Sequence, residues 1–130
     1  MRIFLTKAVA RFVCREAIPE EALLEAIERA ERGIVDADLG DGLLKQRVAR
    51  RSKGRSGGYR MRIGYRRGDR AVFVFGFAKN DQPNIDHSEL ILTRGVAKVW
   101  LNCNKTAIHT ALQNGQLTEV PCGSKKITVN

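Results

Sequence analysis

The chain has 130 residues, of which 43% are hydrophobic and 28% are charged. These values exclude a disordered protein and fit one folded domain, and no apolar run approaches the roughly 20 residues that cross a bilayer. We therefore expect a cytoplasmic protein without a membrane partner. The three cysteines lie far apart and never form a C-x-x-C pair, which argues against a disulfide framework and against a zinc site.

The formal net charge of +9 is distributed unevenly along the chain. Residues 45–70 hold eleven of the 23 basic residues and one acid, Asp69, whereas residues 16–41 hold nine of the 14 acids and two basic residues. Like charges that crowd together destabilise a compact fold unless something of opposite charge binds them. The pattern indicates a polyanionic partner, with nucleic acid favoured over an anionic membrane.

Short patterns predict the first three elements. Residues 2–6, RIFLT, form an apolar run typical of a strand, and Thr6 can cap a helix whose apolar residues follow helical spacing. A second amphipathic helix begins at Pro19, because proline fits the first turn of a helix, and ends at Gly33. The carboxylates that follow Pro19 suit the positive end of the helix dipole.

Three strands are predicted next, at residues 43–50, 59–66 and 71–79, and RRGDR forms the turn between the last two. The third strand is apolar on both faces, as expected of a central strand. In the second strand, alternation separates two sets of side chains. One face carries Tyr59, Met61, Ile63 and Tyr65, and the other carries Arg60, Arg62 and Arg66.

Two helices and a tail complete the predicted fold. Asp86 and Glu89 give a capping-box-like start to the first helix, and the second runs roughly from residue 106 to residue 114. The first helix carries an apolar stripe of Leu92, Val96, Val99 and Trp100, with Trp100 expected in the core. This order predicts an α+β domain at residues 1–118, followed by a tail at residues 119–130. We expect a small antiparallel sheet packed by two N-terminal helices, with further helices at the C-terminal end.

The strongest chemical signal lies in residues 50–67, RRSKGRSGGYRMRIGYRR, which contain no acid. Glycines at positions 54, 57 and 58 let backbone amides, together with Lys53 and Arg55, approach a phosphate closely. The glycine spacing matches neither G-x-x-x-x-G-K-[ST] nor G-x-G-x-x-G. We favour a flexible phosphate-binding loop over a merely solvated basic hairpin.

A longer stretch around this loop carries a family resemblance. GLLKQRVARRSKGRSGGYRMRIGY, followed by FVFGFAKNDQPNI, resembles the RelE/ParE superfamily of bacterial toxins, and specifically the HigB/RelE-like branch of type II toxin–antitoxin systems. The resemblance implies a RelE-like microbial RNase fold and a ribosome-dependent endoribonuclease that cuts mRNA and inhibits translation. It also implies a cognate antitoxin, commonly a helix-turn-helix protein encoded beside the toxin. Arg55 departs from the pattern, since this branch often has lysine there.

RNA cleavage through the 2′-OH requires a group that takes the proton, a cation that stabilises the phosphorane and a group that protonates the leaving oxygen. Arginine suits the second task because its planar fork holds two phosphate oxygens. A lysine beside other cations can handle protons. The catalytic candidates are Lys53, Arg55, Arg60 and Lys79, with Arg47 as a further phosphate clamp.

The same reasoning predicts a wider RNA-binding surface. Its candidates are Lys45, Arg47, Arg50, Arg51, Tyr59, Arg62 and Arg66. Arg62 and Arg66 are expected to follow the RNA backbone rather than to do chemistry. Alternation favours a core position for Tyr59 over base stacking or proton transfer.

We expect no metal and no cofactor. Asp81, Asp86 and Glu89 are explained more simply by turn and capping chemistry, and His87 and His109 by surface or capping roles. Two other functions stay open: a ParE-like inhibitor of DNA gyrase and a non-catalytic RNA- or DNA-binding module. The basic loop favours the nuclease, because an inhibitor of a protein target needs no phosphate clamp.

Overall fold

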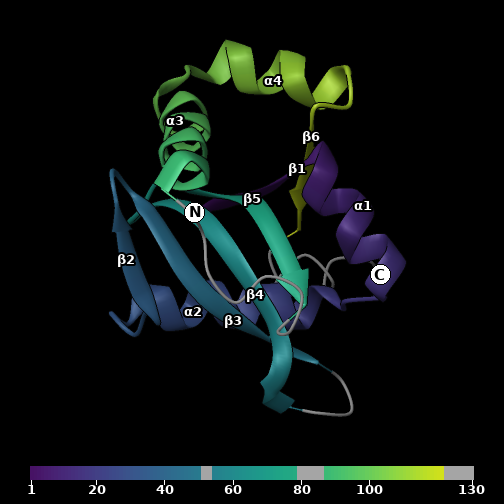
Figure 1. The fold of residues 1–130 in the computed structure, drawn as a ribbon. Helices are drawn as coiled ribbons and strands as arrows, with labels where there is room; N and C mark the ends of the chain where they lie inside the picture. Colours follow the sequence, from purple (N-terminus) through teal and green to yellow (C-terminus); the bar gives the residue numbers. More distant parts are fainter. Residues whose placement is uncertain (51–53, 79–86, 122–130) are drawn as a thin grey trace.

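The computed structural model describes residues 1–50, 54–78 and 87–121, with the backbone alone at residue 50 and at residues 54–57. In the described chain, six strands form one sheet in the order β2-β3-β4-β5-β1-β6 (Figure 1). β1 is parallel to β5, and the other neighbouring strands are antiparallel. The elements are β1 (Arg2–Thr6), α1 (Lys7–Glu16), α2 (Glu20–Glu31), β2 (Ala37–Gly40), β3 (Leu43–Arg50), β4 (Gly54–Arg66), β5 (Arg70–Ala78), α3 (His87–Asn102), α4 (Lys105–Gln113) and β6 (Leu117–Val120).

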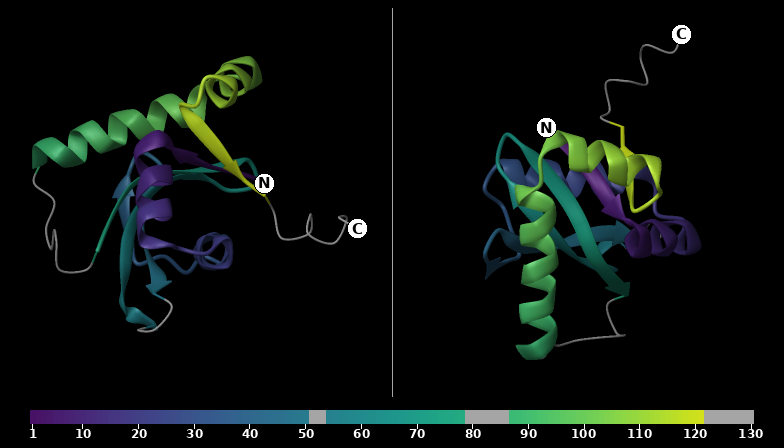
Figure 2. Two further views of the ribbon diagram at one scale, coloured as in Figure 1. Left: turned by 90° about the vertical axis from the view of Figure 1, so that its right-hand side faces the viewer. Right: turned by 90° about the horizontal axis from the view of Figure 1, so that it is seen from above.

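The helices lie on both faces of the sheet and enclose two cores. α1 and α2 pack on one face, whereas α3 crosses β4 and β5 on the other, as Figure 2 shows from two sides. The first core gathers Phe12, Leu23, Met61 and Phe73 with their neighbours, and the second gathers residues such as Phe4, Val72, Ala97 and Ile108. The predicted α+β class is therefore confirmed, with one parallel strand pair in an otherwise antiparallel sheet.

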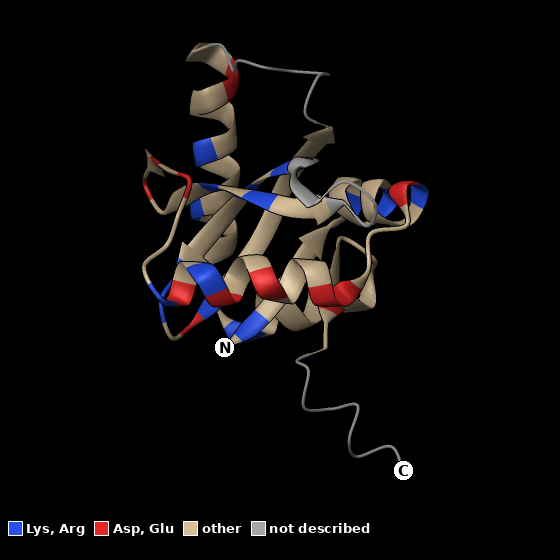
Figure 3. Cartoon of the chain, turned by 90° about the horizontal axis from the view of Figure 1, so that it is seen from below, with Lys and Arg blue, Asp and Glu red and all other residues tan. Residues whose placement is uncertain are grey.

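The N-terminal predictions are confirmed in detail. Thr6 caps α1, since its hydroxyl accepts a hydrogen bond from the Val9 amide at 3.4 Å. Pro19 precedes α2, which ends before Gly33, a residue whose φ of +82° favours glycine. The acids of α2 lie mostly on its outer side, where Figure 3 shows them along the helix.

The sheet contains two strands that the sequence did not predict. β3 matches its predicted bounds, β5 is shifted by one residue and β4 begins at Gly54 rather than at residue 59. β2 and β6 have four residues each, too few for a clear alternation pattern. β6 pairs with β1 and extends across the predicted boundary between residues 118 and 119.

A β-bulge changes the alternation of β5. Arg62 pairs with Phe75, but the next residue of β4, Ile63, pairs with Phe73, so Val74 is an extra residue in β5. Phe73 consequently lies in the first core, whereas Phe75 and Phe77 lie on the opposite face together with Arg62. Regular alternation would have placed all three phenylalanines on one face.

The apolar stripe of α3 does not face the core. Leu92, Val96 and Val99 are 71%, 39% and 62% exposed, and only Trp100 packs against the second core. The helix instead contacts the sheet through Ala97, which lies over Gly64. The other residues on this inner face are Leu90, Arg94 and Leu101. A small residue on each element allows close approach, and this contact determines which face of α3 is buried.

We expect Gly64→Ala and Gly95→Ala to change stability in opposite directions. A methyl group at Gly64 would lie 3.1 Å from Ala97 Cβ and would push α3 away from β4, at a cost of about 1–3 kcal/mol. Gly95 lies in the same helix with nothing within 4 Å of an added Cβ, so alanine should stabilise it by about 0.5–1 kcal/mol. Denaturant unfolding followed by circular dichroism measures both changes, and a stabilised Gly64→Ala protein would contradict this contact.

Candidate functional site

Two rows of side chains cross the face of the sheet on the α3 side. Lys45 of β3 lies directly opposite Arg62 of β4, which lies opposite Phe75 of β5. In the next row, Arg47 lies opposite Arg60, which lies opposite Phe77. Like charges in directly opposite positions destabilise a sheet. Two such pairs side by side therefore favour a surface that binds an anion.

Arg47 stands on a strand that α2 holds in place. Arg29 of α2 is buried, and its guanidinium donates one hydrogen bond to the Arg47 carbonyl and another, at 2.8 Å, to Glu25. The Arg47 amide donates to the Asp36 carboxylate at 2.6 Å. The buried side chain of Gln46 donates to the Ala26 carbonyl at 2.9 Å. The backbone that carries Arg47 is thus fixed on both sides by buried or charged partners.

Arg62 differs from the other cations because it is only 3% exposed. Its guanidinium lies over the rings of Phe75 and Phe77, 5.0 Å and 5.1 Å from their centroids. Burial lowers the pKa of Arg62, while the negative charge of Glu89 acts in the opposite direction. The expectation that Arg62 follows an RNA backbone along the surface does not fit this position, since its burial leaves almost no surface for a phosphate.

Arg66 lies on the same face but binds the end of α3. Its guanidinium donates to the Leu101 carbonyl at 2.7 Å and to the Asn102 side chain at 2.6 Å, and it lies 3.3 Å from Asp69. Arginine at a helix C-terminus satisfies carbonyls that lack a partner within the helix. The position of Arg66 therefore explains it as a structural contact, in place of the expected RNA contact.

Tyr59 lies in the first core, as alternation favours. The side chain is 4% exposed, its ring packs edge-on against Phe12 at 5.5 Å, and its hydroxyl donates to Glu16 at 3.1 Å. Because this ring lies on the face away from the cations, the predicted stacking on an RNA base does not fit the structure.

The cations that remain together on the open face are Lys45 and Arg60, both half-buried, and the exposed Arg47. The side chains of Lys53, Arg55, Lys79, Arg50 and Arg51 fall outside the described residues. Phe75 and Phe77 were not predicted at this site, because regular alternation would place them beside Phe73 in the first core. Only the bulge brings them to the cations, and the sequence has no clear signal for it.

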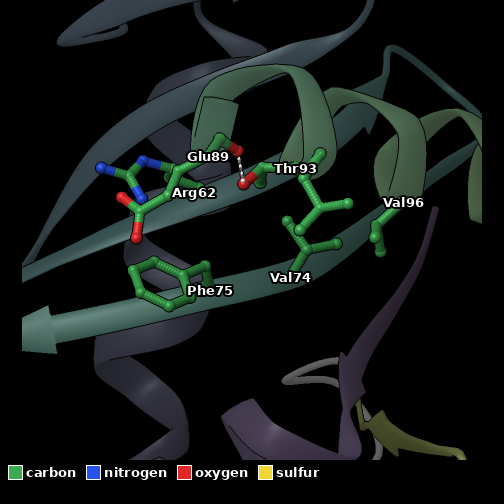
Figure 4. Close-up of a pocket in the computed structure, with 7 residues that line it drawn as sticks. Arg62, Val74, Phe75, Glu89, Thr93 and Val96 are labelled. Atoms are coloured by element: carbon green, nitrogen blue, oxygen red, sulfur yellow. Dashed lines mark hydrogen bonds between the residues drawn. The ribbon is translucent and has the colours of Figure 1, made fainter. Parts of the chain in front are cut away.

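A pocket of about 230 Å³ opens beside Arg62 (Figure 4). Its lining includes Arg62, Val74 and Phe75 of the sheet together with Glu89, Leu92 and Val96 of α3. Most of these side chains are apolar, and Arg62 and Glu89 lie close together at one side of the pocket.

The described residues contain no group of three His, Cys, Asp or Glu side chains that could hold a metal ion. His87 and His109 are both exposed, which fits surface roles. Within residues 1–50, 54–78 and 87–121, no helix has the length and apolar character needed to cross a membrane.

Comparison with known proteins identifies the family. Residues 1–120 match the model of the RelE toxin of the RelE/RelB toxin–antitoxin system, and this match covers nearly the whole described chain. A search of curated proteins finds no significant match. The family match agrees with the α+β fold and with an antitoxin as partner. On this match, the chain belongs to the RelE family of toxins from toxin–antitoxin systems.

Proposed function

We propose that the chain is a ribosome-dependent, metal-independent mRNA endoribonuclease of the HigB/RelE-like branch, which stops translation until its antitoxin binds. The observation that supports the proposal is that two pairs of like-charged residues, Lys45 with Arg62 and Arg47 with Arg60, stand in directly opposite positions on one face of the sheet. Such repulsion costs stability, and an anionic substrate would offset that cost. RNA supplies phosphates that would relieve it.

Arg60 is the central cation of the proposed site. It lies on the middle strand of the three, between Arg47 and Phe77, and is half-buried. Partial burial strengthens its attraction for the charge that develops on the phosphorane. Arg47 is the second clamp, on a backbone that Arg29 fixes.

Proton transfer is assigned to residues whose placement rests on the sequence alone. Lys79 directly follows the last residue of β5, and Lys53 lies between β3 and β4, two residues before Arg55. We propose that these lysines take the 2′-OH proton and protonate the leaving 5′ oxygen, with Arg55 as a further phosphate clamp. Arg50 and Arg51 extend the RNA-binding surface at the end of β3.

Arg60→Ala should lower the rate of mRNA cleavage on ribosomes by about a hundredfold to a thousandfold, because it removes a cation that meets charge in the transition state. Its unfolding midpoint should stay at the wild-type value or rise, since Arg47 then loses a like-charged neighbour. Primer extension on a ribosome-bound mRNA measures the cleavage rate.

The matched control for this experiment is Arg67→Ala. Arg67 is an exposed arginine in the turn between β4 and β5, so the substitution removes the same charge far from the two rows. It should leave cleavage within about twofold of wild type, as most exposed substitutions do. Cleavage by Arg60→Ala at the wild-type rate, or an equal loss of cleavage rate in Arg60→Ala and Arg67→Ala, would contradict the catalytic role of Arg60.

The products should carry a 2′,3′-cyclic phosphate or a 3′-phosphate, because the attacking group is the 2′-OH of the RNA itself. An mRNA with one deoxyribose at the cleavage position should resist cutting, since it lacks that nucleophile. Mass spectrometry of the fragments identifies the ends. A 3′-hydroxyl product, or efficient cutting at the deoxyribose, would show that water attacks. Ribosome-dependent RNA cutting also separates this function from gyrase inhibition and from binding without catalysis.

A further inference from the structure

The pocket beside Arg62 has apolar side chains on two sides. Val74 and Phe75 of β5 line it from the sheet, and Leu92 and Val96 of α3 line it from the helix (Figure 4). Its volume of about 230 Å³ lies below the roughly 300–1,000 Å³ typical of pockets for drug-sized ligands. A space of this size between two apolar sides fits one flat ring system, which proteins hold between aromatic and aliphatic side chains.

Two side chains of opposite charge form the polar part of the pocket. Arg62 and Glu89 lie close together at one side of it. Thr93 also lines the pocket, but its hydroxyl already donates to the Glu89 carbonyl at 2.6 Å. The Nε atom of Arg62 is buried and has no hydrogen-bond partner among the described residues. Buried donors are almost always satisfied, so this one indicates an acceptor that arrives with a ligand.

The presence of both charges limits the chemistry of that ligand. An anionic group on Arg62 would meet the Glu89 carboxylate, and a cationic group on Glu89 would meet the Arg62 guanidinium. A neutral group that presents an acceptor beside donors satisfies both side chains. Guanine has such an edge, because its O6 accepts while its N1–H and N2–H₂ groups donate beside it.

The carboxylate of Glu89 favours guanine over the other bases. An ionised carboxylate accepts hydrogen bonds through two oxygens, which match the two neighbouring donors of guanine. Adenine, cytosine and uracil each have one donor group on the corresponding edge. With any of these three bases, the second oxygen of Glu89 would face no donor of the base.

The pocket lies next to the cations of the proposed site. Arg62 follows Arg60 by two residues in β4, which is about 7 Å along an extended strand, and both side chains lie on the same face. A nucleotide whose phosphate binds Arg60 can therefore place its own base in the pocket. The cations and the pocket together complement the charged and the flat parts of one nucleotide.

We propose that the pocket holds a guanine base of the bound mRNA, with O6 on Arg62 and with N1–H and N2–H₂ on the Glu89 carboxylate. This inference rests on the proposed function, because it takes Arg60 as the cation that binds the phosphate. Arg62 and Glu89 then determine where the mRNA is cut, and they take no part in the chemical step.

The first test is isothermal titration calorimetry of the free full-length protein with mononucleotides. The probes 3′-GMP and 5′-GMP distinguish a guanine before the cleaved bond from a guanine after it. At least one of them should bind about tenfold or more tightly than the corresponding AMP, CMP and UMP, because a bidentate contact to a base discriminates by about this much.

Three variants examine the polar contacts in the same titration. Glu89→Gln keeps the size of the side chain but turns an amide donor toward the donors of guanine, so the preference for GMP should fall to within about twofold. Arg62→Met removes the donor to O6 and should weaken GMP binding about tenfold or more. The matched control Glu28→Gln removes the same charge from an exposed position of α2, on the opposite face of the sheet, and should keep the full preference.

Two further readouts separate base recognition from a structural role. Arg62→Met should unfold at the wild-type temperature or above it, because replacing a buried cation by an apolar side chain of similar volume is often neutral or stabilising. Ribosome-bound mRNAs that differ only in the base next to the cleaved bond should be cut fastest by the wild type where that base is guanine. Glu89→Gln should reduce this difference in rate, whereas a folding defect would slow cleavage of all four mRNAs alike.

Three results would overturn the guanine pocket: equal affinity of the wild-type protein for the four bases, a retained preference for GMP in Glu89→Gln, or a lost preference in Glu28→Gln. Equal affinity for the four bases together with weaker binding of the antitoxin to Glu89→Gln would assign the pocket to a polypeptide. A wild-type protein that binds GMP selectively but cuts no mRNA would contradict the proposed function alone, since the titration needs neither ribosomes nor cleavage.

Discussion

The extra residue in β5 controls the chemistry of the open face of the sheet. Because Val74 has no opposite residue in β4, every side chain after it changes face. Phe75 and Phe77 come to lie under the guanidinium of Arg62, and Gly76 takes the position over the first core. A Cβ at Gly76 would lie only 2.5 Å from the sulfur of Met61, so that core has no room for a side chain there. The bulge turns position 76 toward the first core, and glycine is the residue that fits there.

The two faces of the sheet therefore carry different sets of side chains. On the α1–α2 face, Tyr59 and Met61 are buried among apolar neighbours, and even the tyrosine hydroxyl is bound by Glu16. On the other face, α3 covers only part of the sheet, because it contacts the sheet where Ala97 of α3 lies over Gly64 of β4. The part of the sheet that α3 does not cover holds Lys45, Arg47 and Arg60. The first core and the row of cations are thus separated by the pleat of β4 rather than by distance along the chain.

Sequence patterns predicted the elements that local chemistry determines. Thr6 and Pro19 fix helix starts through capping and a fixed φ, and β3 has a strand pattern clear enough to give both of its ends. The family resemblance, strongest at about residues 42–90, was confirmed at the level of the RelE family by a match over residues 1–120. The shared face of Arg60, Arg62 and Arg66 was predicted because the alternation of β4 is regular and the extra residue lies in β5.

The features that the sequence did not predict depend on contacts between distant segments. Whether Leu92 or Ala97 faces the sheet depends on Gly64, 33 positions before Ala97, and an apolar stripe alone gives the wrong answer. Arg62 and Arg66 have the same residue type and lie on the same face, yet Arg62 packs over aromatic rings and Arg66 binds the end of a helix. No periodicity in the sequence separates these two arginines.

The position of β1 has a consequence for the order of folding. This strand is made before the other strands of the sheet, but it lies between β5 and β6, which begin at residues 70 and 117. It has no neighbour in the sheet until β5 has been made, and its second neighbour, β6, is the last strand of the sheet to be made. Such long-range pairing slows folding, because the chain must close large loops before any contact rewards it. A newly made molecule therefore passes through a stage in which RIFLT is exposed and unpaired, open to a chaperone or to another chain.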